Sequence, residues 1–205
     1  MTATRKLWLF LTGLLVTSFT VLLWVGGEIH REMPPIPNAV VTTTGESLYT
    51  RAEIEQGRQV WQSIGGHQLG SIWGHGSYVA PDWSADWLHR EAVEWLDITA
   101  RNQTGHGYNE LPADQRAVLD ARLKPLIRAN TYDATSGNIT VAPERAQAIA
   151  TVGHHYEALF GNDPKLLDLR KAYAMKDRTV DTAEHRHALT PLELLQLRRR
   201  PRSLG

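Results

Sequence analysis

Side chains able to bind metals or transfer protons gather in one stretch of the sequence, residues 65–91. They are the histidines His67, His75 and His89 and the acidic residues Asp82, Asp86 and Glu91. Imidazole is a common metal ligand, and carboxylates can act as acids and bases. The same stretch is rich in glycine and tryptophan. Because glycine lets the backbone approach a neighbour closely, the sequence indicates that something is bound, buried or docked here.

Structural roles explain these side chains better than catalysis does. No H-E-x-x-H motif or comparable helical pair accompanies the histidines, so we expect His75 to hydrogen-bond within its loop and His89 to cap a helix or face the N-terminal one. His154-His155 is a weak candidate because adjacent helical residues do not share a face, and His185-x-His187 is weak because it lies in a polar stretch. Asp82 follows Pro81 as the expected N-cap of a helix, and capping together with the helix dipole accounts for the acidic residues.

Three tryptophans of this stretch, Trp73, Trp83 and Trp87, together with Trp95 just after it, allow two interpretations. They can form part of the core, or they can form a docking surface, where large aromatic side chains are enriched. A docking surface without its partner would leave an exposed apolar patch. The tryptophan and glycine content favours docking against another part of a larger assembly.

Composition limits the classes of function. The chain has 205 residues, with 22 basic and 22 acidic side chains and no cysteine. A balanced charge gives no global field that would attract nucleic acid, so we expect no nucleic-acid partner. The lack of cysteine excludes disulfides, zinc–thiolate sites, iron–sulfur clusters and haem attached through C-x-x-C-H.

The elements that must position these residues begin with a membrane anchor. No residue from Leu7 to Gly27 is charged, and such a helix spans roughly 31 Å, enough to cross a bilayer. Arg5 and Lys6 precede it, so the positive-inside rule predicts a cytoplasmic N-terminus, a single pass and an extracytoplasmic remainder. A cleaved signal peptide is the alternative, although its apolar region would be shorter and would end in small residues.

The remainder is expected to be mainly α-helical. Thr50 and Glu53 form a capping box that opens a helix, and Gly161 ends another that starts near Pro143. Further helices are predicted at about 83–99, from Pro112 and from Pro164 to about 175, with a small hairpin at 131–140. The predicted organisation is a cytoplasmic N-terminus (1–6), a transmembrane helix (7–27), an extended linker (28–49), an extracytoplasmic helical domain (50–189) and a basic tail (190–205).

Three long motifs of unusual composition carry a family resemblance. They are W-G-H-G-S-Y-V-A-P-D-W-S-A-D-W-L-H-R-E-A (73–92), E-I-H-R-E-M-P-P-I-P (28–37) and V-W-Q-S-I-G-G (60–66), joined by A-Y-A-M-K (172–176). With them the chain resembles the N-terminal region of the quinol-dependent nitric oxide reductases of the haem–copper oxidase superfamily. The resemblance extends to about Leu189-Thr190.

That resemblance implies a fold. In the family, the first transmembrane helix leads into an extracytoplasmic domain with a cytochrome c-like fold and no haem. The related cytochrome-dependent reductases have a small subunit with the same fold and a true C-x-x-C-H site. Aligning the loop after that site on residues 74–81 places Gly66-His67-Gln68-Leu69-Gly70 where C-x-x-C-H would lie. The resemblance therefore implies a cytochrome-like scaffold without its cofactor.

The resemblance also implies ligands and partners. In the family, the backbone carbonyl matching Gly76 and the hydroxyl matching Tyr78 help to bind Ca²⁺ between this domain and the catalytic core. Oxygen ligands suit that cation, but it takes 6–8 of them. The complete enzyme carries haem b, haem b3 and non-haem iron in a transmembrane catalytic core, and none of these cofactors is expected in this chain. Catalytic residues are likewise not expected here, and membrane lipid is the other expected partner.

Two functions remain open at the level of sequence. After Leu189-Thr190, where the family continues into a second apolar helix, the chain reads P-L-E-L-L-Q-L-R-R-R-P-R-S-L-G. This indicates a truncated or frameshifted product or a split gene, so the chain would be the anchor and periplasmic domain of a nitric oxide reductase at the bacterial inner membrane, inactive alone. The alternative is a stand-alone membrane-anchored binding module with a haem-less cytochrome c-like fold.

Overall fold

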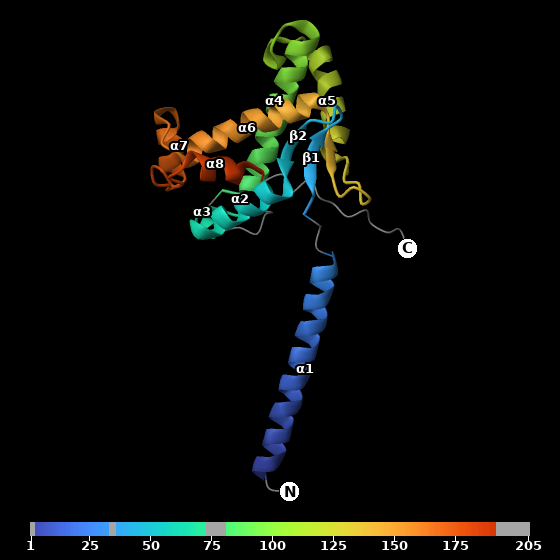
Figure 1. Ribbon diagram of the computed structural model, residues 1–205, viewed down its shortest axis with the longest axis vertical. Helices are drawn as coiled ribbons and strands as arrows, with labels where there is room; N and C mark the ends of the chain where they lie inside the picture. Colours follow the sequence, from blue (N-terminus) through green and yellow to red (C-terminus); the bar gives the residue numbers. More distant parts are fainter. Residues whose placement is uncertain (1–2, 33–35, 73–80, 192–205) are drawn as a thin grey trace. The chain divides into compact units, whose positions relative to one another are not determined.

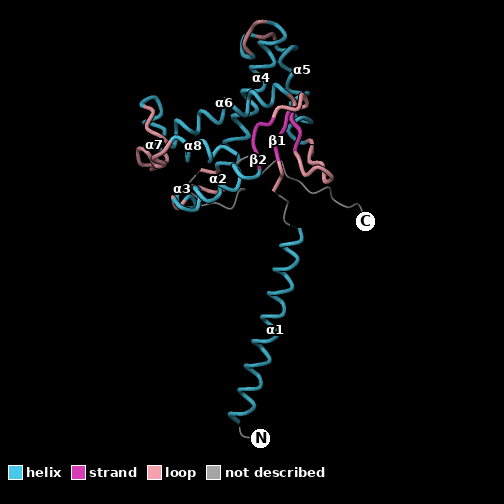
Figure 2. Tube along the Cα trace, viewed as in Figure 1, coloured by secondary structure: helices cyan, strands magenta, loops and turns pink. Residues whose placement is uncertain are grey.

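The computed structural model describes residues 3–32, 36–72 and 81–191 of the chain. It divides into two units, Met1–Pro35 and Ile36–Gly205, which we take in turn. Figure 1 shows the elements in sequence colours, and Figure 2 shows that helices dominate the second unit. Within the described residues, the prediction of a mainly α-helical chain is confirmed.

The first unit is one apolar helix, α1 (Ala3–Glu32). Its segment Thr4–Arg31 has a mean hydropathy of 2.0 and suits a membrane span by length and composition. The hydroxyls of Thr17 and Thr20 donate to the carbonyls of Gly13 and Val16, so they add no unpaired donor to the apolar surface. The helix continues beyond Gly27 and includes the first residues of the predicted extended linker.

The second unit begins with a small sheet where the linker was predicted. Strands β1 (Ala39–Thr42) and β2 (Ser47–Thr50) are antiparallel, and β3 (Ile139–Val141) pairs with β1 in parallel. Val40 and Tyr49 are buried in the core. The prediction of a linker over 28–49 is therefore wrong at both ends, because α1 continues to Glu32 and these strands belong to the folded domain.

Seven α-helices are described in the second unit: α2 (Arg51–Ser63), α3 (Gly66–Leu69), α4 (Trp83–Thr104), α5 (Ala113–Arg128), α6 (Pro143–Phe160), α7 (Leu167–Ala172) and α8 (Ala183–Leu189). Two 3-10 turns, η1 (Tyr108–Glu110) and η2 (Pro164–Leu166), precede α5 and α7. The capping box of α2 is confirmed, since Thr50 and Glu53 each hydrogen-bond the other's backbone N–H. The helix predicted to end near Thr99 continues to Thr104, where Gly105 supplies a left-handed C-cap.

The core consists of two clusters of buried side chains. One lies where α2, α4, α6 and α8 meet the sheet, and it includes Trp61, Trp83, Trp87, Tyr156 and Phe160. The other lies between α4 and α5 and is centred on Trp95, Leu96, Leu111 and Leu119. Helix α4 contributes to both clusters, and in Figure 1 it crosses α6 before it forms a hairpin with α5.

Candidate functional site

Backbone hydrogen bonds join Ser71 to the segment that begins at Pro81, on the other side of residues 73–80. Ser71 accepts a hydrogen bond from the Trp83 backbone N–H, and its own N–H donates to the Pro81 carbonyl, both at 3.0 Å. Gly76 and Tyr78, the predicted Ca²⁺ ligands, lie outside the described residues, as do His75 and Trp73. Their roles stay predictions.

The segment aligned with C-x-x-C-H is the short helix α3 with its C-cap, and two of its glycines contact indole rings. A Cβ added at Gly66 would lie 2.1 Å from the Trp61 ring. A Cβ added at Gly70 would lie 2.3 Å from Nε1 of Trp83 and 2.5 Å from the Pro81 carbonyl oxygen. These separations are far below van der Waals contact, so the backbone reaches these rings only because both positions are glycine.

The indoles beside α3 belong to an aromatic core, which we define as Trp61, Trp83, Trp87, Tyr156, Phe160 and Tyr173. Trp83 makes edge contacts with Tyr156 and Tyr173, at centroid distances of 6.1 and 5.4 Å. Trp87 stacks on Tyr156 at 5.1 Å. The cavity beside these rings measures about 20 Å³, which is room for about one water molecule. Nothing of macrocycle size fits there without displacing indoles.

The docking interpretation of the tryptophans is wrong for the three described ones. Trp83 and Trp87 are each 1% exposed, and Trp95 is 3% exposed. Large aromatic side chains bury more apolar area than most residues do. These three bury it in the core of the domain. Sequence pattern alone left core and docking open, because both favour the same residue types.

Asp82 has the capping role that was expected, whereas Asp86 binds side chains of α4 and α6. Asp82 caps α4, since its Oδ1 accepts from the Ser84 N–H at 3.1 Å. Asp86 accepts from Arg90 Nε at 2.8 Å and from the Tyr156 hydroxyl at 2.6 Å. Burial would raise the pKa of the Asp86 carboxyl, but these hydrogen bonds outweigh it and lower the pKa. Asp86 is therefore held as the carboxylate and does not suit a proton donor at neutral pH.

Glu91 has a role that capping does not explain. It is 2% exposed, and its Oε1 accepts from Arg145 Nε at 2.6 Å. Its Oε2 accepts from the Trp87 indole at 3.2 Å, and Arg145 Nη1 donates to the Leu126 carbonyl. This buried ion pair joins α4 to α6 and reaches the end of α5. The partner lies 54 residues away in sequence, so no local pattern points to it.

The histidines do not converge on a metal site. His89 lies inside α4 and is exposed, so it caps no helix. His154 and His187 both approach Glu157, with Nδ1–carboxylate distances of 3.3 and 2.6 Å, while His155 faces Tyr156. Among the residues that the structure describes, no group of three or more histidines and carboxylates could hold a metal ion.

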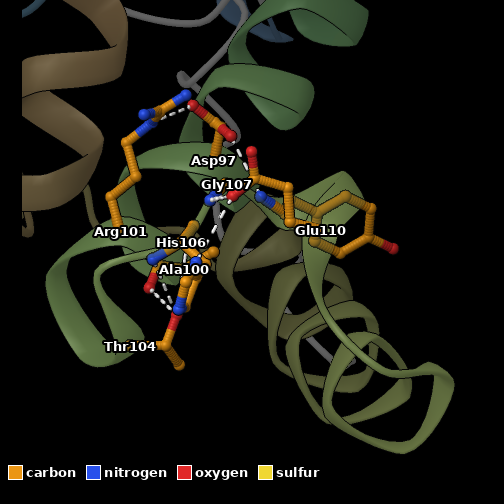
Figure 3. A network of polar contacts seen from close by, with 8 residues as sticks. Asp97, Ala100, Arg101, Thr104, His106, Gly107 and Glu110 are labelled. Atoms are coloured by element: carbon orange, nitrogen blue, oxygen red, sulfur yellow. Dashed lines mark hydrogen bonds and ion pairs between the residues drawn. The ribbon is translucent and has the colours of Figure 1, made fainter.

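The turn between α4 and η1 holds the second polar network of α4 (Figure 3). Asp97 accepts from Arg101 Nε at 2.6 Å and from the Tyr108 N–H at 3.0 Å. Glu110 accepts from the Gly107 N–H at 2.9 Å. The hydrogen bond from Arg101 is the main reason that the pKa of Asp97 is lowered. These contacts fix a turn and leave no side chain poised for chemistry.

Comparison with known proteins gives one family. Residues 37–192 match the cytochrome c-like domain of NorB, a component of nitric oxide reductase. A search of curated proteins found no significant match. The family match begins just before the sheet and ends just after α8, so it covers nearly all of the described second unit. The chain therefore belongs to the family of the NorB cytochrome c-like domain of nitric oxide reductase.

Proposed function

We propose that this chain provides the membrane anchor and the haem-free extracytoplasmic domain of a quinol-dependent nitric oxide reductase. In such an enzyme, two NO, two protons and two electrons from quinol give N₂O and one water in a transmembrane catalytic core. The role proposed for this domain is structural: it covers the outer face of that core, and α1 holds it at the bacterial inner membrane with the N-terminus in the cytoplasm.

The close contact of α3 with the indoles is the observation that carries the haem-free assignment. When the loop at 74–81 is aligned with that of the cytochrome-dependent reductases, Gly66 takes the place of their first haem-attaching cysteine and Gly70 that of their axial histidine. A Cβ at either position would overlap an indole of the aromatic core. Side chains of cysteine and histidine would need still more room, so the residues present do not fit a c-type haem.

Absorbance of the purified chain tests this assignment. The full chain, produced in bacteria that mature c-type and b-type cytochromes and purified in detergent, should show no Soret band above its protein background. About one haem per chain would overturn the proposal. A reporter fusion after Pro191 tests the orientation, since alkaline phosphatase should be active there and inactive when fused before Thr4.

The structural role makes a separate prediction for the complete enzyme. In a reductase that carries this domain, Trp83→Ala should lower the amount of assembled enzyme in the membrane while NO turnover per haem stays unchanged. A loss of turnover per haem at normal enzyme levels would assign the domain a direct part in catalysis and contradict the proposal.

A further inference from the structure

A groove of about 450 Å³ opens between α4 and α6. Its described lining consists of His89, Arg90, Val93 and Glu94 from α4 and Thr151, Val152 and His155 from α6. The buried residues Trp87, Glu91 and Trp95 mark the faces of α4 that pack into the two core clusters. The groove is thus a different site from the aromatic core, and neither capping nor core packing accounts for its charged lining.

Two cationic or basic side chains in the groove have unused hydrogen-bonding capacity. Arg90 uses Nε to bind Asp86, and its Nη groups have no partner among the described residues. The Nε2 atom of His155 is buried and also lacks a partner in the described part of the chain. Because a buried polar atom without a hydrogen bond is destabilising, the groove can gain from a ligand that supplies an acceptor.

The charges around His155 favour an anion as that ligand. Burial lowers the pKa of the His155 imidazole, and the positive charge of Arg90 lowers it further, whereas Asp86 acts in the opposite direction. Asp86 is already bound by Arg90 and by the Tyr156 hydroxyl. A negative group beside Arg90 would offset the guanidinium charge and let His155 donate a charge-assisted hydrogen bond.

The remaining lining restricts the size and charge of the ligand. Val93 is 52% exposed at the groove, which is unusual for a large apolar side chain in this domain, and Thr151 lies on the α6 side of the groove. A short hydrocarbon chain would cover that surface. Glu94 adds one negative charge to the wall, which disfavours multiply charged anions such as phosphate.

We propose that the groove between α4 and α6 binds a small aliphatic monocarboxylate, with its carboxylate between Arg90 and His155 and its hydrocarbon body against Val93. The site recognises one negative charge and a short apolar chain together. The inference does not depend on nitric oxide reduction, because every group that it uses belongs to this domain.

Titration with sodium butyrate tests the proposal. The full chain, labelled with ¹⁵N in its histidine rings and held in detergent micelles, should show a saturable shift of the His155 ring signals. The dissociation constant should be on the order of 1 mM, as suits a ligand of a few heavy atoms. Butyramide, which has the same shape without the charge, should bind at least tenfold more weakly. Equal shifts with butyramide, or no saturation with butyrate, would overturn the proposal.

Two exposed valines, Val93 on α4 and Val118 on α5, supply a matched pair of variants. Val93→Asp puts a negative charge in the groove and should weaken butyrate binding at least tenfold. Val118→Asp, at the other exposed valine on α5, should leave binding unchanged. Both positions are on helix surfaces, so both variants should keep the circular dichroism of the parent chain. Parent-like binding by Val93→Asp would contradict the site, and so would equal weakening in both variants.

Discussion

The two ends of α4 are stabilised in different ways. Around its first half, aromatic rings from α2, α4, α6 and the α7 segment contact one another over long sequence separations. Around its second half, the core is mainly aliphatic, and the turn into η1 is fixed by the exposed network of Asp97, Arg101 and Glu110 (Figure 3). The first region depends on tertiary packing, and the second depends largely on local hydrogen bonds.

This difference predicts which substitutions the domain tolerates least. A cytochrome-like scaffold without a haem, as we propose for this chain, must fill the space beside α3 with side chains, and the aromatic core can do so. Its rings leave only a cavity of about 20 Å³. The α4–α5 end carries no such requirement, since its polar contacts connect residues that are close in sequence. Substitutions in the aromatic core should therefore have larger effects and should affect the whole domain.

Replacing Trp83 by alanine should have the largest effect. The side chain is 1% exposed and contacts three other rings, so its loss should lower the free energy of unfolding by about 3–5 kcal/mol. Leu119→Ala in the second cluster, by comparison, should cost about 2–3 kcal/mol. Denaturant unfolding of the chain in detergent measures both, and near-ultraviolet circular dichroism should collapse in Trp83→Ala alone. Equal costs with unchanged dichroism would remove the contrast between the regions.

Breaking the buried ion pair tests whether the two regions unfold together. Arg145→Met leaves the Glu91 carboxylate buried and unpaired, which should cost about 3 kcal/mol. The double variant Glu91→Leu with Arg145→Met removes both charges and should regain most of that loss. Thermal unfolding followed at tryptophan and by far-ultraviolet dichroism would show whether the regions separate. A double variant no more stable than Arg145→Met would show that the pair acts through something other than charge.

Local signals made much of the fold predictable from sequence. Residues only a few positions apart determine several helix ends. They are the capping box of α2, the Asp82 cap of α4, and the start and end of α6 at Pro143 and Gly161. Capping preferences depend on the nearest backbone N–H groups, so they need no tertiary information. The apolar length of α1 is a signal of the same kind.

Tertiary contacts account for what the sequence did not reveal. The parallel pairing of β1 with β3 joins residues about a hundred positions apart, and the turn-rich segment before β3 gave no indication of that partner. Helix α8 is only seven residues long and lacks a clear apolar period. Arg90 and His155 each lie in an ordinary helix, and only the crossing of α4 over α6 brings them to one groove.

Adding a methyl group to Gly66 tests the close contact that argues against a haem. Because the new Cβ would lie 2.1 Å from the Trp61 ring, Gly66→Ala should lower the free energy of unfolding by about 1–3 kcal/mol through overpacking. Gly153→Ala is the matched control, since its Cβ would meet Thr190 no closer than 3.4 Å and alanine favours the helix. The control should change stability by less than about 1 kcal/mol. A neutral Gly66→Ala would mean that α3 can move away from the indole.

Acid titration compares one carboxylate from each region, and its expected effect is the smallest. The pKa values of Asp86 and Asp97 are both lowered in the folded chain, so each carboxylate stabilises the fold above its unfolded pKa of about 3.9. That contribution is lost as the pH falls through the folded pKa. Asp86→Asn should cost about 2 kcal/mol at pH 7, since it weakens two hydrogen bonds to a partly buried carboxylate, and Asp97→Asn about 1 kcal/mol.

Both losses should shrink as the pH falls below about 3.9, where the unfolded carboxyls take up protons, and should vanish only once the folded carboxyls are protonated as well. Unfolding at several pH values from neutral down to about pH 3 provides the measurement. A larger effect for Asp97 than for Asp86 would reverse the comparison, because it would place the stronger electrostatic restraint at the α4–α5 end. The exposed turn would then hold the domain against acid, and the aromatic core would hold it only by packing.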